Sequence, residues 1–223
     1  MPELDSPIHL EMLRDSPSRK SLPARLFRAV RNEWKSEGVY GLEWGDPETW
    51  APLKFIRDRY VMPYVNPDHV AVEIGAGGGR WTRYLLDFRL LYAVDYHEPL
   101  LQELRKKFRR YPQVRFIRNN GSDFPGIEPL SVDYLFSFGT FVHLDFAIIE
   151  SYLHSIRPIM KPNGQAVIAY SDKAKIMAKI NPEFSDNDVE RMRSAVQRSG
   201  FRIVEEDNTT MWHSSIVRFT PQG

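Results

Sequence analysis

The sequence contains no cysteine, and its positive and negative charges almost cancel. Without cysteine the chain forms no disulfide and offers no thiolate to a metal, so the redox compartment stays undecided. The 30 Lys and Arg residues are balanced by 29 Asp and Glu, which leaves a formal net charge of +1. This balance gives no electrostatic argument for a nucleic-acid partner. Hydrophobic residues make up 42% and charged residues 26%, as in an ordinary globular protein.

Long hydrophobic runs are also missing. No apolar run approaches the length of a membrane span, and the opening residues MPELDSPIHL lack the basic and then apolar plan of a signal peptide. We therefore expect a cytoplasmic protein that has no membrane partner. The 223 residues suffice for one domain with a sizeable core.

Composition divides the chain into three segments. Residues 1–22 are rich in Ser, Pro and charge, which predicts a flexible amino-terminal arm. Residues 23–66 predict helices, the second of which is capped by Asp46 and ends before Pro63. Residues 67–223 have a different texture and predict the main domain.

In this main domain, short apolar runs alternate with helical patterns. Strands buried on both faces and separated by helices imply a mainly parallel sheet with helices on either side. The last two runs are joined only by DNTTMWH, which is too short for a parallel crossover, so they should pair antiparallel. The expected fold is α/β, with a seven-stranded sheet whose last strand is antiparallel. Strands are expected at 69–75, 90–95, 114–119, 132–138, 165–171, 201–206 and 214–220, and helices at 80–87, 98–109, 145–158 and 186–199.

The stretch VEIGAGGGRW, residues 72–81, predicts a buried strand that enters a glycine-rich turn and then a helix. In an open parallel sheet, ligands bind beyond the carboxyl ends of the strands. Glycines let the backbone turn tightly and approach a ligand, and a following helix offers free amide donors. The dinucleotide template G-x-G-x-x-G fails because Arg80 stands where its last glycine belongs, and no Gly-Lys-Ser/Thr follows for a phosphate loop. The turn alone leaves its ligand open.

Acidic residues at the strand ends narrow the choice. Glu73 lies inside the first strand, where a buried carboxylate needs a partner such as a ligand ammonium or the loop amides. Asp95 ends the second strand, where an acid can accept both hydroxyls of a ribose. Asp123 and Phe124 follow the third strand and could meet an exocyclic amine and the face of a base. The alternative is that these are ordinary strand-end acids beside a tight turn.

Together, E-x-G-x-G-x-G at 73–79, Asp95 and Asp123 resemble the S-adenosylmethionine site of the Rossmann-like (class I) methyltransferases. The resemblance covers about residues 65–220, including the run RPIMKPNG before the fifth strand. It implies a Rossmann-like methyltransferase fold with S-adenosyl-L-methionine as the cofactor.

The resemblance also assigns roles within the donor site. The glycine turn and Glu73 would hold the methionine end, Asp95 the ribose, and Asp123 with Phe124 the adenine. The cofactor-binding residues expected on this basis are Glu73, Gly75, Ala76, Gly77, Asp95, Tyr96, Ser122, Asp123, Phe124 and Ser137.

Candidate acceptor residues follow the fourth and sixth strands. The fourth strand ends SFGT rather than in the Asn/Asp-Pro-Pro-aromatic run typical of enzymes that methylate base amines, which argues against a nucleic-acid substrate. Thr140 is a candidate for substrate binding, and His143 could act as a base toward a hydroxyl; the alternative is a helix-start histidine that packs or caps next to Asp145. Trp212 and His213 could face the site from the last hairpin, unless they form an ordinary hairpin tip.

The loop GLEWGDPETW, residues 41–50, carries Trp44 and Trp50. In the methyltransferases the segment before the first strand often forms a lid, so residues 23–66 would be an amino-terminal helical lid and both tryptophans would contact substrate. The alternative is that these tryptophans dock the amino-terminal helices onto the sheet.

We expect neither a metal nor a nucleic acid to bind. Converging metal ligands are missing, because the fourth strand ends in Ser137 and the fifth carries a single acid, Asp172. The basic run LRKKFRRY, residues 104–111, shares its helix with Glu98 and Glu103, which is typical of a solvated outer face; RNA binding there is the alternative.

The sequence thus predicts an enzyme that moves a methyl group from S-adenosylmethionine to a hydroxyl of a small molecule, with a sugar or a natural product as candidate acceptors. His143 and His213 are the candidate catalytic residues. A second reading is methylation of an amine or carboxylate, and a third is a non-catalytic relative that keeps the donor fold. Both a monomer and a homodimer are compatible with the sequence.

Overall fold

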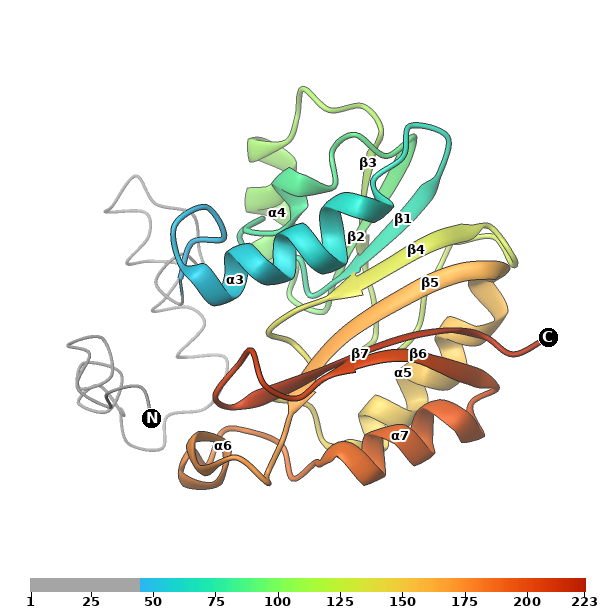
Figure 1. The fold of residues 1–223 in the computed structure, drawn as a ribbon. Helices are drawn as coiled ribbons and strands as arrows, with labels where there is room; N and C mark the ends of the chain where they lie inside the picture. Colours follow the sequence, from blue (N-terminus) through green and yellow to red (C-terminus); the bar gives the residue numbers. More distant parts are fainter. Residues whose placement is uncertain (1–44) are drawn as a thin grey trace. The chain divides into compact units, whose positions relative to one another are not determined.

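The structure, a computed structural model, describes residues 45–223 (Figure 1). The expected arm at 1–22, the portion of the expected lid at 23–44, and with it Trp44, lie outside the described residues. The account that follows concerns the described part alone.

The seven strands form one sheet in the order β3-β2-β1-β4-β5-β7-β6. Neighbouring strands pair in parallel except at β7, which is antiparallel to both β5 and β6. The predicted α/β fold with an antiparallel last strand is therefore confirmed. The strands are β1 (Val70–Ile74), β2 (Leu90–Asp95), β3 (Val114–Arg118), β4 (Val132–Ser137), β5 (Met160–Ser171), β6 (Phe201–Asp207) and β7 (Ser214–Pro221).

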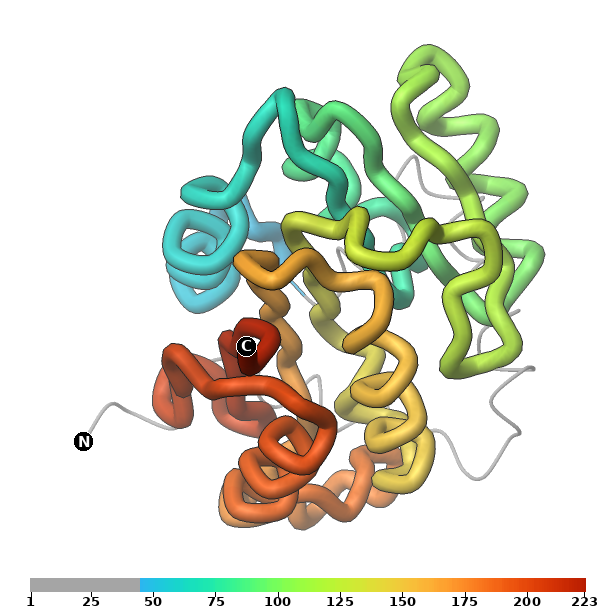
Figure 2. Tube along the Cα trace, turned by 90° about the vertical axis from the view of Figure 1, so that its right-hand side faces the viewer, coloured from blue at the N-terminus to red at the C-terminus, as the bar shows by residue number. Residues whose placement is uncertain are grey.

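Helices cover both faces of this sheet, and α5 and α7 lie side by side on one of them (Figures 1 and 2). Helix α7 buries Met192, Ala195 and Val196, which recur at helical spacing and face the sheet. On the other face, α3 and α4 pack over β1, β2 and β4. The long helices are α3 (Ala51–Ile56), α4 (Glu98–Lys107), α5 (Phe146–Ile159) and α7 (Val189–Arg198).

The carboxyl ends of the parallel strands share one edge of the sheet, at the left in Figure 1. The start of α3, the short helix α6 (Ile176–Ile180) and the turn between β6 and β7 lie at the same edge. Segments that are far apart in the sequence therefore meet there, which is where ligands bind in open parallel sheets.

The prediction of a helix over residues 80–87 is wrong. After the glycine turn the chain forms only a three-residue 3-10 helix, η4 (Thr82–Tyr84), between tight turns whose N–H groups bond to the carbonyl three residues earlier. Residues 79–82 are four consecutive buried residues, which would occupy every side of one α-helical turn rather than a single inward face. No helix N-terminus therefore supplies the amide donors expected at this turn.

The second predicted helix starts later and runs farther than expected. Asp46 accepts the backbone N–H of Glu48 at 3.0 Å, but in a turn that precedes α3, and regular helix begins only at Ala51. Pro63 fits inside a helical turn because the first residues of a helix need no intrahelical N–H bond. The last part of the predicted helix is the π-helix η2 (Arg57–Val61). The 3-10 helix η3 (Met62–Tyr64), which continues past Pro63, and α6 were not predicted.

Candidate active site

The glycine turn is held so tightly that two of its positions accept only glycine. Gly75 has a φ of +73°, and a Cβ there would lie 1.7 Å from Oγ1 of Thr140. Gly79 has a φ of +83°, and a Cβ there would lie 2.6 Å from the ring of Phe108, which directly follows α4. The turn is also tied to β2, since Gly75 donates its N–H to the carbonyl of Val94 at 2.8 Å. Side-chain-free backbone thus lines the carboxyl end of β1.

Asp95 ends β2 directly beside this turn. Its carboxylate accepts the backbone N–H of Gly77 at 3.0 Å and that of His97 at 2.9 Å. The side chain is only 7% exposed, so these two bonds fix its orientation. An ionised carboxylate has about four lone-pair positions, so the group keeps the capacity to accept two ligand hydroxyls.

Glu73 is buried in β1, with only 3% of its surface exposed. Oγ1 of Thr82 donates a hydrogen bond to its Oε2 at 2.6 Å. Burial, together with the nearby Asp95 charge, raises the pKa of Glu73 to about 8, while the Thr82 bond acts in the opposite direction. Thr82 is therefore the partner that this buried acid requires, and the sequence analysis did not predict it.

The loop after β3 holds the residues expected at the adenine. Asp123 accepts the backbone N–H of Asn120 at 2.8 Å, and Ser122 accepts a hydrogen bond from the hydroxyl of Ser151 at 2.9 Å. Phe124 is buried and packs against the ring of Tyr152 on α5, which makes it part of the core. Phe124 therefore stabilises the loop that carries Asp123.

Tyr96 and Asn119 complete this end of the site. Tyr96 is 52% exposed, and a Cβ on Gly121 would come within 3.9 Å of its ring. Asn119 donates its side-chain N–H to the hydroxyl of Tyr152 at 2.8 Å, while its buried Oδ1 has no hydrogen-bond partner. A buried acceptor without a donor is costly, and a ligand N–H would satisfy it. Asn119 was not among the predicted site residues, although it directly follows the third strand.

Ser137 and Ala76 are both buried in the protein. Ser137, at the end of β4, is fully buried and donates its hydroxyl hydrogen to the carbonyl of Ile74 at 2.9 Å. Ala76 is buried in the core beneath the turn. Thr140 donates to the same Ile74 carbonyl at 3.5 Å. These contacts join the carboxyl ends of β1 and β4.

Arg80 brings a positive charge to the glycine turn. Its guanidinium lies 5.7 Å from the ring centre of Phe138 and 5.9 Å from that of Trp81, and it donates to the carbonyl of Gly45 at 3.4 Å. The side chain is largely buried. Arg80 directly follows the last glycine of the turn. The sequence analysis considered Arg80 only because it stands where the dinucleotide template requires a glycine.

The two candidate histidines both contact the ring of Phe184. His143 lies between β4 and α5, and His213 lies between β6 and β7. The ring centre of Phe184 lies 5.4 Å from that of His143 and 4.9 Å from that of His213. Nδ1 of His143 lies 3.1 Å from the carbonyl oxygen of Glu183. A carbonyl only accepts, so Nδ1 carries the proton of the neutral ring and Nε2 is its basic nitrogen. Phe184 was not predicted.

The surroundings of His213 differ from those of the exposed His143. Burial, the neighbouring His143 and Lys175 lower the pKa of His213 to about 4. Its Nδ1 is buried without a hydrogen-bond partner. Lys175 donates to the carbonyls of Met211 and Ser214 at 2.9 and 2.6 Å, which anchors the segment that carries His213.

The tryptophans of the described part also meet. Trp50 and Trp212 make an edge-to-face contact with ring centres 6.0 Å apart. Trp212 is 48% exposed, whereas Trp50 is half-buried above Gly45.

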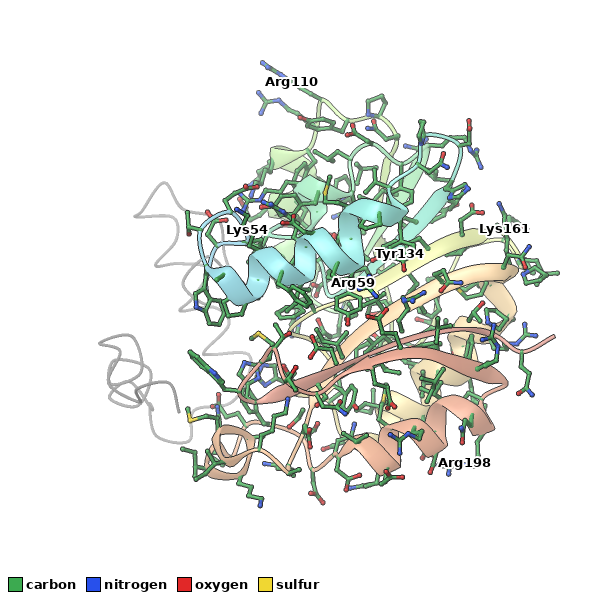
Figure 3. The ribbon with its side chains drawn as sticks, viewed as in Figure 1. Lys54, Arg59, Arg110, Tyr134, Lys161 and Arg198 are labelled. Atoms are coloured by element: carbon green, nitrogen blue, oxygen red, sulfur yellow. The ribbon has the colours of Figure 1, made fainter. Side chains whose placement is uncertain are left out.

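Basic side chains come from separate elements, as the labelled Lys54, Arg59, Arg110, Lys161 and Arg198 show in Figure 3. Three of these are in ion pairs with acids. In the run 104–111, two of the five basic residues, Arg105 and Lys106, pair with acids of the same helix at 2.6 and 2.8 Å. This arrangement is typical of a solvated helix face.

Two further searches concern residues 45–223 alone. No three His, Asp or Glu side chains within that range are grouped so that they could hold a metal ion. None of the helices described there combines the length and the apolarity that a membrane crossing requires.

Comparisons with known proteins concern the domain and the fold of this chain. Residues 71–164 match the family described as methyltransferase domain. The search of curated proteins finds no match. The solved structure of the CcbJ methyltransferase from Streptomyces caelestis is similar with a TM-score of 0.64 at 15% identity, over 80% of this chain and 99% of that one.

Two more solved structures share the fold. An S-adenosylmethionine-dependent methyltransferase from Clostridium acetobutylicum has a TM-score of 0.66 at 13% identity, over 90% of this chain and all of that one. The glycopeptide N-methyltransferase MtfA, solved with S-adenosylmethionine, has a TM-score of 0.57 at 16% identity, over 70% and 82% of the two chains. The chain thus has the class I Rossmann-like fold of these methyltransferase structures, and its residues 71–164 match the methyltransferase domain family.

Proposed function

We propose that this methyltransferase acts on a hydroxyl of a small molecule and that His143 takes the hydroxyl proton. The observation that carries the proposal is the hydrogen bond from His143 to the Glu183 carbonyl, which leaves Nε2 as the proton-accepting atom. A base is useful for a hydroxyl acceptor, which must lose its proton when it is methylated.

The donor half of the site fits S-adenosylmethionine. The glycine turn offers backbone that a Cβ would block, and Asp95 retains acceptor capacity for the ribose hydroxyls. We assign Glu73 to the ammonium of the methionine end, and Asp123 with Asn119 and Tyr96 to the adenine. Arg80 supplies a positive charge beside the turn, suited to the donor carboxylate. When bound, S-adenosylmethionine supplies a methyl group on a sulfonium sulfur that leaves as a thioether.

The two histidines receive different roles. The acceptor oxygen forms the bond to the methyl carbon, the electron pair of the broken carbon–sulfur bond stays on sulfur, and the hydroxyl proton passes to Nε2 of His143. His213 is a weak base because its pKa is lowered to about 4, so it stays neutral at pH 7 and serves as a hydrogen-bonding group. Trp50, Trp212 and Thr140 remain our proposed substrate contacts, and the segment up to residue 66 our proposed lid.

A second candidate is methylation of an amine. It is favoured by one comparison, since MtfA shares the fold and is a glycopeptide N-methyltransferase. A neutral amine attacks without prior loss of a proton, so this reaction would depend less on His143.

The first experiment is calorimetric titration of the protein with S-adenosylhomocysteine, with NAD as the control. Binding of the first and not of the second is expected. A panel of sugars, phenols and amines then identifies an acceptor by transfer of labelled methyl.

Substitution of His143 separates the two candidates. His143→Gln should lower kcat by a factor on the order of 10² to 10⁴ while affinity for S-adenosylhomocysteine stays unchanged. His154→Gln is the matched control, because His154 is also exposed and also has its Nδ1 on a backbone carbonyl, at 2.7 Å, but lies on α5. An unchanged kcat in His143→Gln would contradict the base and favour the amine.

A further inference from the structure

Five aromatic and imidazole rings lie in series along the carboxyl edge of the sheet, linked by three ring contacts and by one pair of consecutive residues. We name this series the aromatic rim; it comes from four separate segments, before α3, between β6 and β7, between α6 and α7, and between β4 and α5. Adjacent rings lie 4.9 to 6.0 Å apart, except that the second and third are consecutive residues. In order, the rim consists of Trp50, Trp212, His213, Phe184 and His143.

Both ends of the aromatic rim meet the glycine turn of the donor site. At one end, the backbone N–H of His143 donates to the backbone carbonyl of Thr140 at 3.1 Å, and Thr140 packs directly on Gly75. At the other end, Trp50 covers Gly45, whose carbonyl accepts from Arg80 of the turn. The rim therefore begins and ends on residues that contact the donor site, and Figure 1 shows its segments gathered at one edge.

Two charged groups beside the rim, Lys175 and Asp172, are already engaged by the protein. Lys175 donates to two backbone carbonyls, as described above. Asp172 accepts from the hydroxyl of Ser215 at 2.7 Å and from the N–H of Ala174 at 3.0 Å. What the rim itself presents is ring surface, including the half-exposed Trp212, and imidazole nitrogen. Such a surface favours a flat, uncharged ligand that packs face or edge against rings.

The acidity of the acceptor hydroxyl also favours an aromatic ligand. A phenolic hydroxyl has a pKa of about 10, whereas an aliphatic or sugar hydroxyl is a much weaker acid. An imidazole base is therefore better matched to a phenol, because the proton transfer is less uphill.

We infer that the acceptor is an aromatic hydroxyl, a phenol whose ring packs against Trp212 and Phe184 of the aromatic rim. This inference rests on the proposed function, since it names the acceptor class of that O-methyl transfer. The phenolic proton passes to Nε2 of His143, and the phenol oxygen forms the bond to the methyl carbon while the carbon–sulfur electron pair stays on sulfur.

The test uses the full chain saturated with S-adenosylhomocysteine. Calorimetric titration with 2-naphthol should show binding, and decahydro-2-naphthol, which has the same skeleton and hydroxyl but no aromatic ring, should bind at least tenfold more weakly. Methyl α-glucopyranoside should not bind. Transfer of labelled methyl from S-adenosylmethionine should follow the same order.

Two substitutions locate the binding surface. Trp212→Ala and Phe184→Leu should each weaken 2-naphthol binding at least tenfold, and thermal unfolding should show that both variants fold. Tyr111→Ala is the matched control, since Tyr111 is 41% exposed but precedes β3 at the opposite edge of the sheet, and it should leave binding unchanged. If Phe184→Leu fails to fold, the exposed Trp212 carries the test.

The outcomes separate the inference from the proposed function. The aromatic acceptor is overturned if 2-naphthol does not bind to the protein that is saturated with S-adenosylhomocysteine. It is also overturned if decahydro-2-naphthol binds as tightly as 2-naphthol. Methyl transfer to the glucoside and not to phenols overturns the inference but keeps the O-methyl transfer. Transfer to amines alone overturns both.

Discussion

Binding of the donor should depend on pH through Glu73. The pKa of this buried carboxyl is about 8, so below pH 8 most molecules hold it protonated. A ligand ammonium interacts favourably with the ionised form, so binding at lower pH must first expel a proton. One pKa unit corresponds to about 1.4 kcal/mol, so affinity should fall by up to about tenfold per pH unit below 8. Between pH 8 and pH 6 the expected loss is as much as about 100-fold.

The assay is calorimetric titration with S-adenosylhomocysteine at pH 6, 7 and 8, for the natural protein and for Glu73→Gln. The glutamine keeps the size and the polar contact to Thr82 but does not titrate. The ratio of the two affinities cancels the ionisation of the ligand itself. The natural protein should gain affinity with pH relative to Glu73→Gln, and proton release should be visible in buffers of different ionisation enthalpy. A ratio that stays constant across these pH values would refute the assignment of Glu73 to the ammonium.

Three further predictions follow from the same site. Asp95→Ala should weaken binding of S-adenosylhomocysteine by about 1 to 3 kcal/mol, because polar partners lose their acceptor; an unchanged dissociation constant in calorimetry would count against the ribose role. Gly75→Ala should destabilise the protein by several kcal/mol more than Gly126→Ala in urea unfolding, because both have a positive φ but only Gly75 would clash, with Thr140; equal losses would contradict this packing. Because the folded-state pKa of Glu73 exceeds its usual value of 4.5, the free energy of unfolding should fall as pH rises from about 5 to 8, by as much as about 4 kcal/mol relative to Glu73→Gln. Parallel curves would show that burial does not raise this pKa.

Local patterns in the sequence determined most of the fold. Apolar runs bounded by turns marked all seven strands, and the short connection after the sixth determined that the last strand is antiparallel. The donor site followed from residues close in sequence to strand ends. Parallel strands place their carboxyl ends at one edge, so Gly75 and Asp95 had to become neighbours, and the bond between the Gly77 N–H and Asp95 shows that they did.

The tertiary structure decided which side chains satisfy one another. The helix expected after the glycine turn gives way to 3-10 turns in which Thr82 faces inward and donates to Glu73, and no local periodicity announces such a contact. Phe184 joins His143 to His213 although all three lie on different connections, and Trp50 reaches Trp212 across the sheet edge. A sequence pattern records the period of one element, whereas the partner of a buried acid or an exposed ring depends on how separate elements pack. That packing decided which side chains meet at the carboxyl edge of the sheet.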